Sequence, residues 1–282
     1  MQRRGDDPLN PGIVLAVHSY KGGTGKTLVS TNLATILASQ GKNVCLIDLD
    51  LRAPSLDATF AADGKYWIND FLSGTCEPMD VLKDFSKEKN TSGRLLVALA
   101  NPSMEAIRDV VTKDKKWEMG ALRRLLSLKE FLIKNQALDY MIIDTSPGLS
   151  YGSINAVAAA DLVLVVSTWD ASDITGTQGM IGELYKLLEK RAIVIMNKIP
   201  EQLIIGEEMK KRMADQFKRA FKLPVTDLLP CYCDVLRQER ATIMVLEKPD
   251  HPFSKSLVEI AKKVEKAGEK PATPTKMSEK GT

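Results

Sequence analysis

The residues with the clearest chemical purpose form a glycine-rich segment near the N-terminus, HSYKGGTGKT, at residues 18–27. The segment follows a short apolar run and opens a helical pattern. Its glycines allow successive backbone N–H groups to point inward around phosphate oxygens, and the start of a helix adds a partial positive charge. The Lys26 ammonium would reach the β- and γ-phosphates of a nucleotide, and the Thr27 hydroxyl would bind Mg²⁺. The spacing therefore predicts a phosphate-binding loop.

This loop departs from the strict GxxxxGK(S/T) pattern, because Tyr20 occupies the position of the first glycine and a second lysine, Lys21, follows it. The KGGTGKT segment resembles the deviant Walker A motif of the MinD/ParA family of ATPases, and the resemblance extends over roughly residues 12–262. It implies that Lys21 reaches across a nucleotide-sandwich dimer, where a cation would stabilise charge developing in phosphoryl transfer. The expected nucleotide contacts in the loop are Lys21, Gly22, Gly23, Thr24, Gly25, Lys26, Thr27 and Leu28.

Aspartates follow two further apolar runs. Asp48 and Asp50 come at the end of the run 44–47, and Asp144 comes directly after the run 140–143, in the segment DTSPG. Carboxylates at the carboxyl ends of parallel strands face the ligand crevice of an open α/β sheet. An aspartate directly after an apolar strand is also the Walker B arrangement, which holds Mg²⁺ in nucleotide hydrolases.

The family resemblance implies a role for each of these groups. Asp50 would belong to switch I and position or deprotonate the attacking water, while Asp144 would hold Mg²⁺ through water. Asp48 would be a supporting acid near Thr27 and the metal, and Gly148 would let switch II move towards the γ-phosphate. The predicted catalytic residues are Lys21, Lys26, Asp50 and Asp144. The predicted metal ligands are Thr27, Asp50 and Asp144.

Residues for the nucleotide base come later in the chain. Asn197 follows the run 193–196, and the resemblance implies that its amide hydrogen-bonds the adenine edge. Pro230 and Cys231 follow the last apolar run, and the resemblance implies that they cover the ring. A guanine-specific NKxD motif is absent, because Pro200 stands where its aspartate would be. The choice of adenine over guanine rests on the family resemblance, which implies ATP, ADP and Mg²⁺ as the cofactors.

The elements that must position these residues alternate along the chain. Short apolar runs typical of strands buried on both faces occupy 13–17, 44–47, 95–99, 140–143, 162–166, 193–196 and 225–229. Helical patterns occupy 27–40, 122–133, 179–189, 207–221 and 254–264, and the family resemblance implies a further short helix at 67–74, after switch I. The alternation predicts one doubly wound α/β domain with a mostly parallel sheet flanked by helices, of the P-loop NTPase, deviant Walker A type. We expect an N-terminal extension at 1–11, the ATPase domain at 12–265 and a disordered basic tail at 266–282.

Composition sets limits on function. The 282 residues include 39 Lys and Arg against 36 Asp and Glu, a net charge of +3 that the segment 262–282 supplies alone. Four cysteines in a chain of this length do not form a disulfide scaffold, so a reducing cytoplasm fits best. No apolar run reaches the about 18 residues that cross a bilayer, and the tail lacks the apolar face of an interfacial anchor. Membrane targeting is therefore not expected.

The predicted function is a Mg²⁺-dependent ATPase switch. It would form an ATP-sandwich homodimer and use hydrolysis to organise a cargo in space, by chromosome or plasmid partitioning or by MinD-like positioning, with an activating protein partner. Six basic residues between Glu207 and Lys222 could bind DNA non-specifically on the nucleoid, although interleaved acids favour a solvated helix face. The alternative is a metallocluster or metal-insertion ATPase, in which Cys231 and Cys233 of two subunits meet at the dimer interface.

Overall fold

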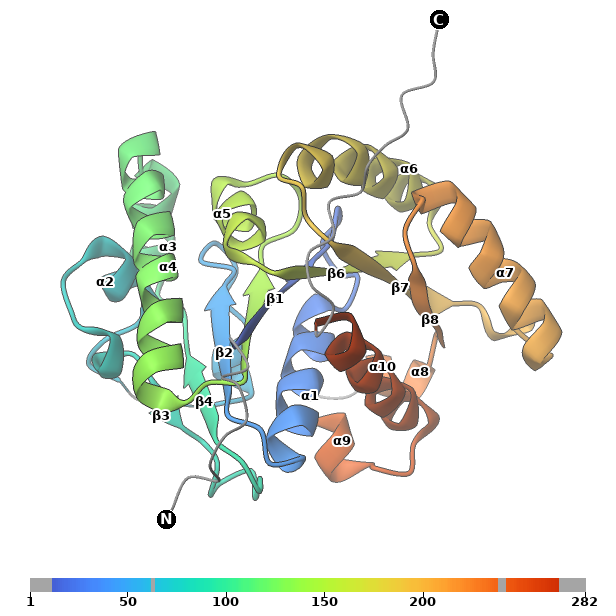
Figure 1. Cartoon of the computed structure of the whole chain (residues 1–282), viewed down its shortest axis with the longest axis horizontal. Coiled ribbons are helices and arrows are strands. Elements are labelled where there is room, and N and C mark those ends of the chain that lie inside the picture. Colours follow the sequence, from blue (N-terminus) through green and yellow to red (C-terminus); the bar gives the residue numbers. More distant parts are fainter. Residues whose placement is uncertain (1–11, 62–63, 238–241, 269–282) are drawn as a thin grey trace, which may run out of the picture.

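The computed structural model describes residues 12–61, 64–237 and 242–268. The predicted extension at 1–11 and the tail from residue 269 onward lie outside the described residues. Within them, an eight-stranded sheet has the order β3-β4-β2-β5-β1-β6-β7-β8. Neighbouring strands are parallel except β3 and β4, which are antiparallel. Helices lie on both sides of this sheet (Figure 1). The predicted doubly wound α/β fold is confirmed.

The strands are β1 (Ile13–His18), β2 (Val44–Leu49), β3 (Lys83–Asp84), β4 (Leu95–Ala98), β5 (Tyr140–Thr145), β6 (Leu162–Thr168), β7 (Ala192–Ile199) and β8 (Val225–Pro230). The helices are α1 (Lys26–Ser39), α2 (Ile68–Ser73), α3 (Met104–Thr112), α4 (Lys115–Gln136), α5 (Tyr151–Ala159), α6 (Ala171–Met180), α7 (Gly206–Phe221), α8 (Cys233–Leu236), α9 (Met244–Glu247) and α10 (Pro252–Gly268). A π-helical turn, Ile181–Tyr185, extends α6. Every predicted strand is present, and α10 continues three residues past the predicted domain end at 265.

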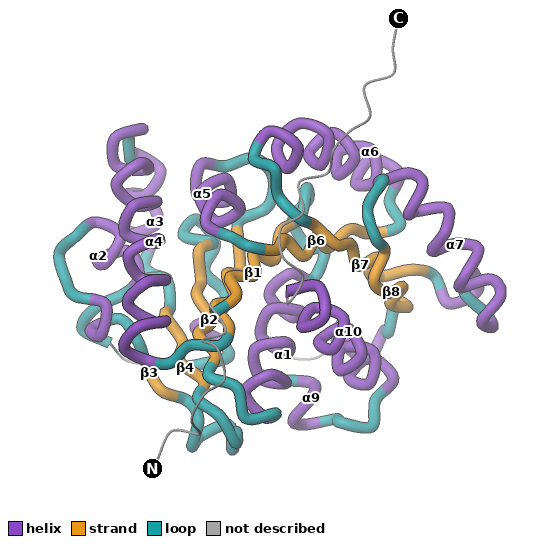
Figure 2. Tube along the Cα trace, in the orientation of Figure 1, coloured by secondary structure: helices purple, strands orange, loops and turns teal. Residues whose placement is uncertain are grey.

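The sheet carries a hydrophobic core on each face, because alternate side chains of a strand point to opposite sides. In β1, Val14 and Ala16 belong to the core under α4, α5 and α7. Ile13, Leu15 and Val17 belong to the core under α1 and α10. Figure 2 shows these two helical layers on either side of the orange strands. Consecutive apolar residues in the sequence therefore reflect burial on both faces, as predicted.

Parallel pairing gathers the carboxyl ends of the central strands at one edge of the sheet. The register places Asp48 of β2 opposite Asp144 of β5, and Val17 of β1 opposite the same residue. The loop after β1 thus begins beside both aspartates. Among the described residues, no helix has the length and apolar character needed to cross a bilayer.

Candidate nucleotide-binding site

The loop between β1 and α1 leads into the uncapped N-terminus of α1. Gly25 is the N-cap of α1, and its φ of 102° lies in the left-handed region that favours glycine. A Cβ at this position would also lie 2.6 Å from the Asn197 amide nitrogen. No side chain caps the helix, so its first N–H groups are available to a bound anion.

Lys26, the first residue of α1, lies at the centre of this loop. Its side chain is 7% exposed, and its Nζ donates to Ser19 Oγ at 3.0 Å. Burial lowers the pKa of the Lys26 ammonium, while the nearby carboxylates of Asp144 and Asp50 act in the opposite direction. A cation held in a largely buried position without a directly bonded carboxylate can neutralise a phosphate oxygen.

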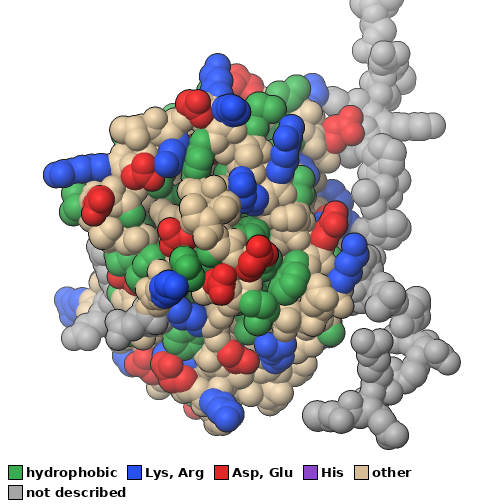
Figure 3. Space-filling view, turned by 90° about the vertical axis from the view of Figure 1, so that its left-hand side faces the viewer, with side chains coloured by type: hydrophobic (Ala, Val, Ile, Leu, Met, Phe, Trp, Pro, Cys, Tyr) green, Lys and Arg blue, Asp and Glu red, His purple; other side chains and the backbone are tan. Residues whose placement is uncertain are grey.

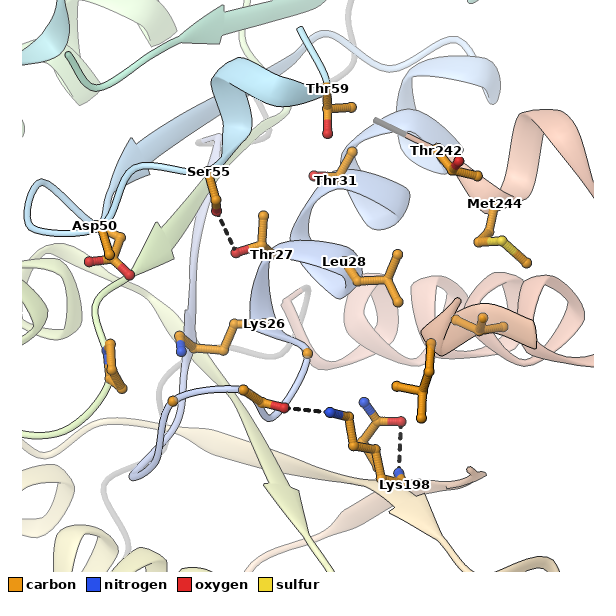
Figure 4. A pocket seen from close by; sticks show the side chains of 18 of the residues that line it. Lys26, Thr27, Leu28, Thr31, Asp50, Ser55, Thr59, Lys198, Thr242 and Met244 are labelled. Carbon is orange, nitrogen blue, oxygen red and sulfur yellow. Dashed lines mark hydrogen bonds between the residues drawn. The ribbon is translucent and has the colours of Figure 1, made fainter. Parts of the chain in front are cut away.

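A cavity of about 810 Å³ opens beside the loop, within the range of small-molecule sites. Figure 4 shows its walls, with Lys26 and Asp50 at one side and Thr242 and Met244 at the other. The predicted residues that line it are Gly22, Gly23, Gly25, Lys26, Thr27, Leu28, Asp50, Asn197, Pro230 and Cys231. Lining residues that the sequence reasoning missed include Arg52, Ser55, Thr59, Ser146, Lys198 and Met244.

Asp144 lies behind the loop and is fully buried. Its carboxylate accepts hydrogen bonds from Thr27 Oγ1 at 2.7 Å and from Ser30 Oγ at 3.0 Å. Burial raises the pKa of Asp144 to about 6, although both hydroxyls and the charge of Lys26 favour the ionised form. The predicted pair of Thr27 and Asp144 is therefore in direct contact.

Asp48 and Asp50, two residues apart, have different surroundings. Asp50 lines the cavity, and burial raises the pKa of its carboxyl against a hydrogen bond from Ser146. Asp48 is completely buried and accepts from the backbone N–H groups of Asp50, Ser55 and Leu56, at 3.0, 3.4 and 3.3 Å. These three hydrogen bonds stabilise the loop after β2, and it is Ser55 Oγ that contacts Thr27 Oγ1, at 3.2 Å.

These side chains form a donor set that suits Mg²⁺. The ion prefers oxygen ligands, keeps several waters, and is commonly bound through one or two carboxylates together with substrate phosphates. The Thr27 hydroxyl, the Asp144 carboxylate and the Asp50 carboxylate supply such oxygens beside the phosphate loop. Within the described ranges, no group of three or more His, Cys, Asp and Glu side chains could hold a metal ion by protein ligands alone.

Lys21 does not line the cavity of its own chain. Its Nζ forms an ion pair with Asp170 at 2.7 Å, and it also donates to Ser172 Oγ, both at the start of α6. The hydrogen bond from Lys21 holds the pKa of the Asp170 carboxyl well below its usual range. The lysine side chain is 41% exposed, so this pair is open to solvent.

The neighbouring Tyr20 packs on the same helix. Its ring lies against Gly176 of α6, and a Cβ at that glycine would overlap the ring. Tyr20 therefore occupies space that is available only because residue 176 has no side chain. Tyr20 and Lys21 together join the phosphate loop to α6.

Asn197 lies at the end of β7 and braces the loop from outside. Its amide nitrogen donates to Thr24 O at 2.8 Å, and its amide oxygen accepts from the Lys198 N–H at 2.9 Å. Lys198 Nζ donates to Gly23 O at 2.7 Å (Figure 4). Lys198 adopts a left-handed φ of 59°, uncommon for a lysine. The contact of Asn197 with the adenine edge stays a prediction, and the bracing role of Lys198 was not predicted.

The other end of the cavity is formed by the segment after β8. Pro230, Cys231 and Tyr232 line it, and the Tyr232 ring packs edge-on against Phe253 with a centroid separation of 6.2 Å. Cys231 is half-buried and Cys233 is exposed, and both are free thiols. Because Cys231 faces the nucleotide cavity, the metal site predicted for Cys231 and Cys233 in a dimer finds no support and stays a prediction.

The parallel sheet, the glycine-rich loop and the Thr27–Asp144 pair define a P-loop nucleotide-binding protein. A family model described as an AAA domain matches residues 12–198. The septum site-determining protein MinD of Thermotoga maritima is 28% identical over 261 residues, which cover 91% of this chain and 89% of that protein. The chain therefore belongs to the MinD/ParA family of P-loop ATPases, as its loop predicted.

Solved structures agree with this assignment. The septum site-determining protein MinD of Pyrococcus horikoshii, complexed with Mg-ADP, superposes with a TM-score of 0.72 at 21% identity and covers 92% of this chain and 98% of that chain. The MinC:MinD cell division protein complex of Aquifex aeolicus superposes with a TM-score of 0.70 at 25% identity, over 90% and 96%.

Proposed function

We propose that this protein is a Mg²⁺-dependent ATPase that works as a nucleotide-controlled switch. The observation that carries the proposal is the geometry of the loop. Lys26 Nζ lies at its centre, the first turn of α1 is uncapped, and the Thr27 hydroxyl contacts the Asp144 carboxylate at 2.7 Å. Each group matches one demand of a bound nucleoside triphosphate, which brings phosphate charge and a hard cation together.

In the proposed reaction, Lys26 would exchange its bond to Ser19 for the β- and γ-phosphates. Thr27 and Asp144 would hold Mg²⁺, which neutralises charge on the phosphates when it is bound. Asp50 would orient the attacking water, and the raised pKa of its buried carboxyl makes it a better proton acceptor than an ordinary aspartate. The Ser146 hydroxyl would keep Asp50 in place.

Lys21 is the residue through which we propose that ATP controls assembly. Its pair with Asp170 is exposed to solvent, where ion pairs contribute little, so the ammonium can be transferred to the phosphates of a second subunit at low cost. A sandwich homodimer would form with ATP and separate after hydrolysis. While ATP is bound, the dimer would present a surface that the monomer lacks.

The test is the oligomeric state in different nucleotides. Size-exclusion chromatography with light scattering should give a monomer with Mg-ADP and a dimer with Mg-ATP for the Asp50→Ala variant, which binds ATP but cannot position water. The Asp57→Ala variant, at a half-buried aspartate that does not line the cavity, is the control and should behave as the wild type. An Asp50→Ala protein that stays monomeric with ATP contradicts the switch. Asp170→Ala, which frees Lys21, should raise the dimer fraction by roughly up to fivefold.

We further propose that the dimer acts with partners to position a cargo. The MinD of Aquifex aeolicus was solved in a complex with MinC, which supports an activating or effector protein for this chain also. DNA is the second candidate partner. On α7, Lys210 pairs with Asp227 at 2.9 Å and Arg212 pairs with Glu208 at 2.6 Å, so only part of the helix's positive charge is available.

Charge on another face is mixed. Figure 3 shows basic and acidic side chains interspersed over the side formed by α2, α3 and α4, without a large patch of one sign. DNA affinity would therefore depend on dimerisation aligning the α7 helices. Retention on random duplex DNA that requires ATP and falls steeply with salt would support this partner, whereas ATP-independent retention would contradict it.

A further inference from the structure

A buried histidine lies directly beneath the phosphate loop. His18, the last residue of β1, has no exposed surface. Its Nδ1 lies 2.8 Å from Tyr185 Oη, and its Nε2 lies 2.8 Å from the carbonyl oxygen of Gly148 in the switch II segment. The imidazole therefore bridges a helix and a switch loop that are remote from each other in sequence.

The partners determine the protonation of the ring. A carbonyl oxygen can only accept, so His18 Nε2 carries a proton and donates it to Gly148. Burial lowers the pKa of His18 to about 4, and the nearby charge of Lys26 acts in the same direction, so the ring is neutral at physiological pH. Nδ1 is then an acceptor, and the Tyr185 hydroxyl must be the donor. The hydrogen bonds run in one direction, from Tyr185 through His18 to Gly148.

Both the carbonyl oxygen and the N–H of Gly148 form hydrogen bonds. Its carbonyl accepts a second hydrogen bond, from Ser153 Oγ at 2.7 Å, while its N–H donates to Ser19 O at 2.9 Å. Its φ of 71° lies in the left-handed region that suits glycine. Because the N–H and the carbonyl of one residue belong to different peptide planes, rotation at Gly148 can move the N–H while the carbonyl stays fixed.

Tyr185 reaches the histidine from an unusual backbone. It is the last residue of the π-helical turn Ile181–Tyr185 and is 2% exposed. Single π-helical turns are rare and occur frequently at functional sites, because the wider turn redirects a side chain. The helix that precedes this turn also carries the partners of Tyr20 and Lys21.

We propose that Tyr185 and His18 are positioning residues for switch II, holding the Gly148 carbonyl as a fixed pivot from which the Gly148 N–H turns from Ser19 towards the γ-phosphate. The inference rests on the proposed ATPase function. Neither residue touches the cavity, so nucleotide affinity depends on the loop and stays unchanged when the pivot loosens. Turnover depends on the position of switch II in the transition state and falls.

The kinetic test removes one hydroxyl. Tyr185→Phe leaves His18 Nδ1 without its donor and should lower kcat by roughly fivefold to tenfold, while KM for ATP and Kd for ADP stay within about twofold of wild type. Tyr140→Phe, at the opposite end of the sheet in β5, is the matched control and should keep the wild-type kcat. An unchanged kcat for Tyr185→Phe overturns the inference, and so does a parallel loss of kcat and ADP affinity, which marks a general structural defect.

A spectroscopic test reads the tautomer directly. The chain has only two histidines, so long-range ¹H–¹⁵N spectra of the imidazoles resolve each ring. His18 should be the Nε2–H tautomer in the wild type and should become a mixture of tautomers in Tyr185→Phe. His251, whose Nδ1 accepts from the Phe253 N–H at 3.1 Å, is the internal reference. An Nδ1–H ring at His18 in the wild type refutes the pivot.

The two proposals fail in different ways. If the wild-type protein neither binds nor hydrolyses ATP, the proposed function is wrong and the pivot is overturned with it. If the wild type hydrolyses ATP while Tyr185→Phe retains both its kcat and its His18 tautomer, the ATPase assignment stands and only the pivot is refuted.

Discussion

The two ends of the cavity are built differently. At the phosphate end, Lys26, Thr27 and Asp144 are buried or half-buried, and each has a directly bonded protein partner. At the base end, Cys231 and Tyr232 are half-buried and contact their neighbours mainly by ring packing and main-chain bonds. The phosphate end is preorganised before any ligand arrives, whereas the base end is mostly a shaped surface.

This contrast has an energetic meaning. Buried polar groups that already have partners need little reorganisation to receive a charged ligand, so one altered residue there should have a large effect. A packed surface distributes its contribution over many weak contacts, so one altered residue should matter less. The following experiments measure whether affinity is divided between the two ends in this way.

The largest effect is expected for Lys26→Ala. Loss of the ammonium removes charge-assisted hydrogen bonds to the phosphates, and Kd for ATP should rise about 100-fold, near 3 kcal/mol. Isothermal titration calorimetry measures it, with Lys42→Ala at the opposite edge of the sheet as the control. An ATP affinity within a few-fold of wild type would show that the loop assignment is wrong.

The second effect concerns His18, the buried residue beneath the phosphate loop, and the pH dependence of the free energy of unfolding. The pKa of His18 is lowered to about 4 from 6.5, so the unfolded chain binds more protons than the native state between these values. Stability linked to His18 is therefore full above pH 6.5 and is lost as pH falls towards 4. Between pH 7 and pH 5, urea unfolding should show a wild-type loss that exceeds that of His18→Leu by on the order of 2 kcal/mol. Parallel losses in the two proteins would contradict a neutral buried ring.

Asn197 joins the two ends, and its variant separates their contributions. Asn197→Ala removes the bond to Thr24 O, so the loop should loosen and affinity should fall about tenfold, near 1.4 kcal/mol. If Asn197 acts as a brace, ATP and inorganic triphosphate should weaken equally. A loss confined to ATP would instead assign the residue to the adenine edge, as the family resemblance implies.

The smallest effect is expected at the base end. Tyr232→Ala removes one wall of the cavity, and Kd for ATP should rise about fivefold, near 1 kcal/mol, while inorganic triphosphate binds as before. Competition binding with both ligands measures the difference. A loss as large as that of Lys26→Ala would abolish the contrast between the ends.

The central strands of the fold were predictable because each is buried on both faces and forms an apolar run, whereas the edge strand β8, half-buried over its first three residues, gave only a weak run. β3 was not predictable, because two residues leave no pattern. Among the described residues, α3, α5 and the short α8 and α9 were also missed, and α6 begins at Ala171, eight residues before the predicted start at 179. In α5 the buried face consists of Ser153, Ala156, Val157 and Ala159, which are too small and too evenly mixed to give a clear helical period. In α3 only Val110 is buried, so packing leaves little trace in the sequence.

The site residues also differ in how well the sequence predicts their contacts. Phosphate-end residues lie in contiguous motifs, and the sheet register that brings Asp144 to Thr27 follows from parallel pairing. The direction of Lys21 towards Asp170 and the brace by Lys198 could not be predicted, since they depend on contacts between segments about 150 or more residues apart. Contacts between residues so far apart produce no short-range sequence pattern from which they could be predicted.

The packing of Tyr20 on Gly176 has a consequence for how this sequence can evolve. The ring and the missing side chain share one volume, so neither position is free to change alone. Enlarging residue 176 would push the Tyr20 ring, which is already partly exposed, into solvent, and reducing Tyr20 would uncover α6 at Gly176. Among related sequences, a bulky residue at one of these positions should therefore accompany a small one at the other. That covariation would record a compensating exchange between the phosphate loop and α6.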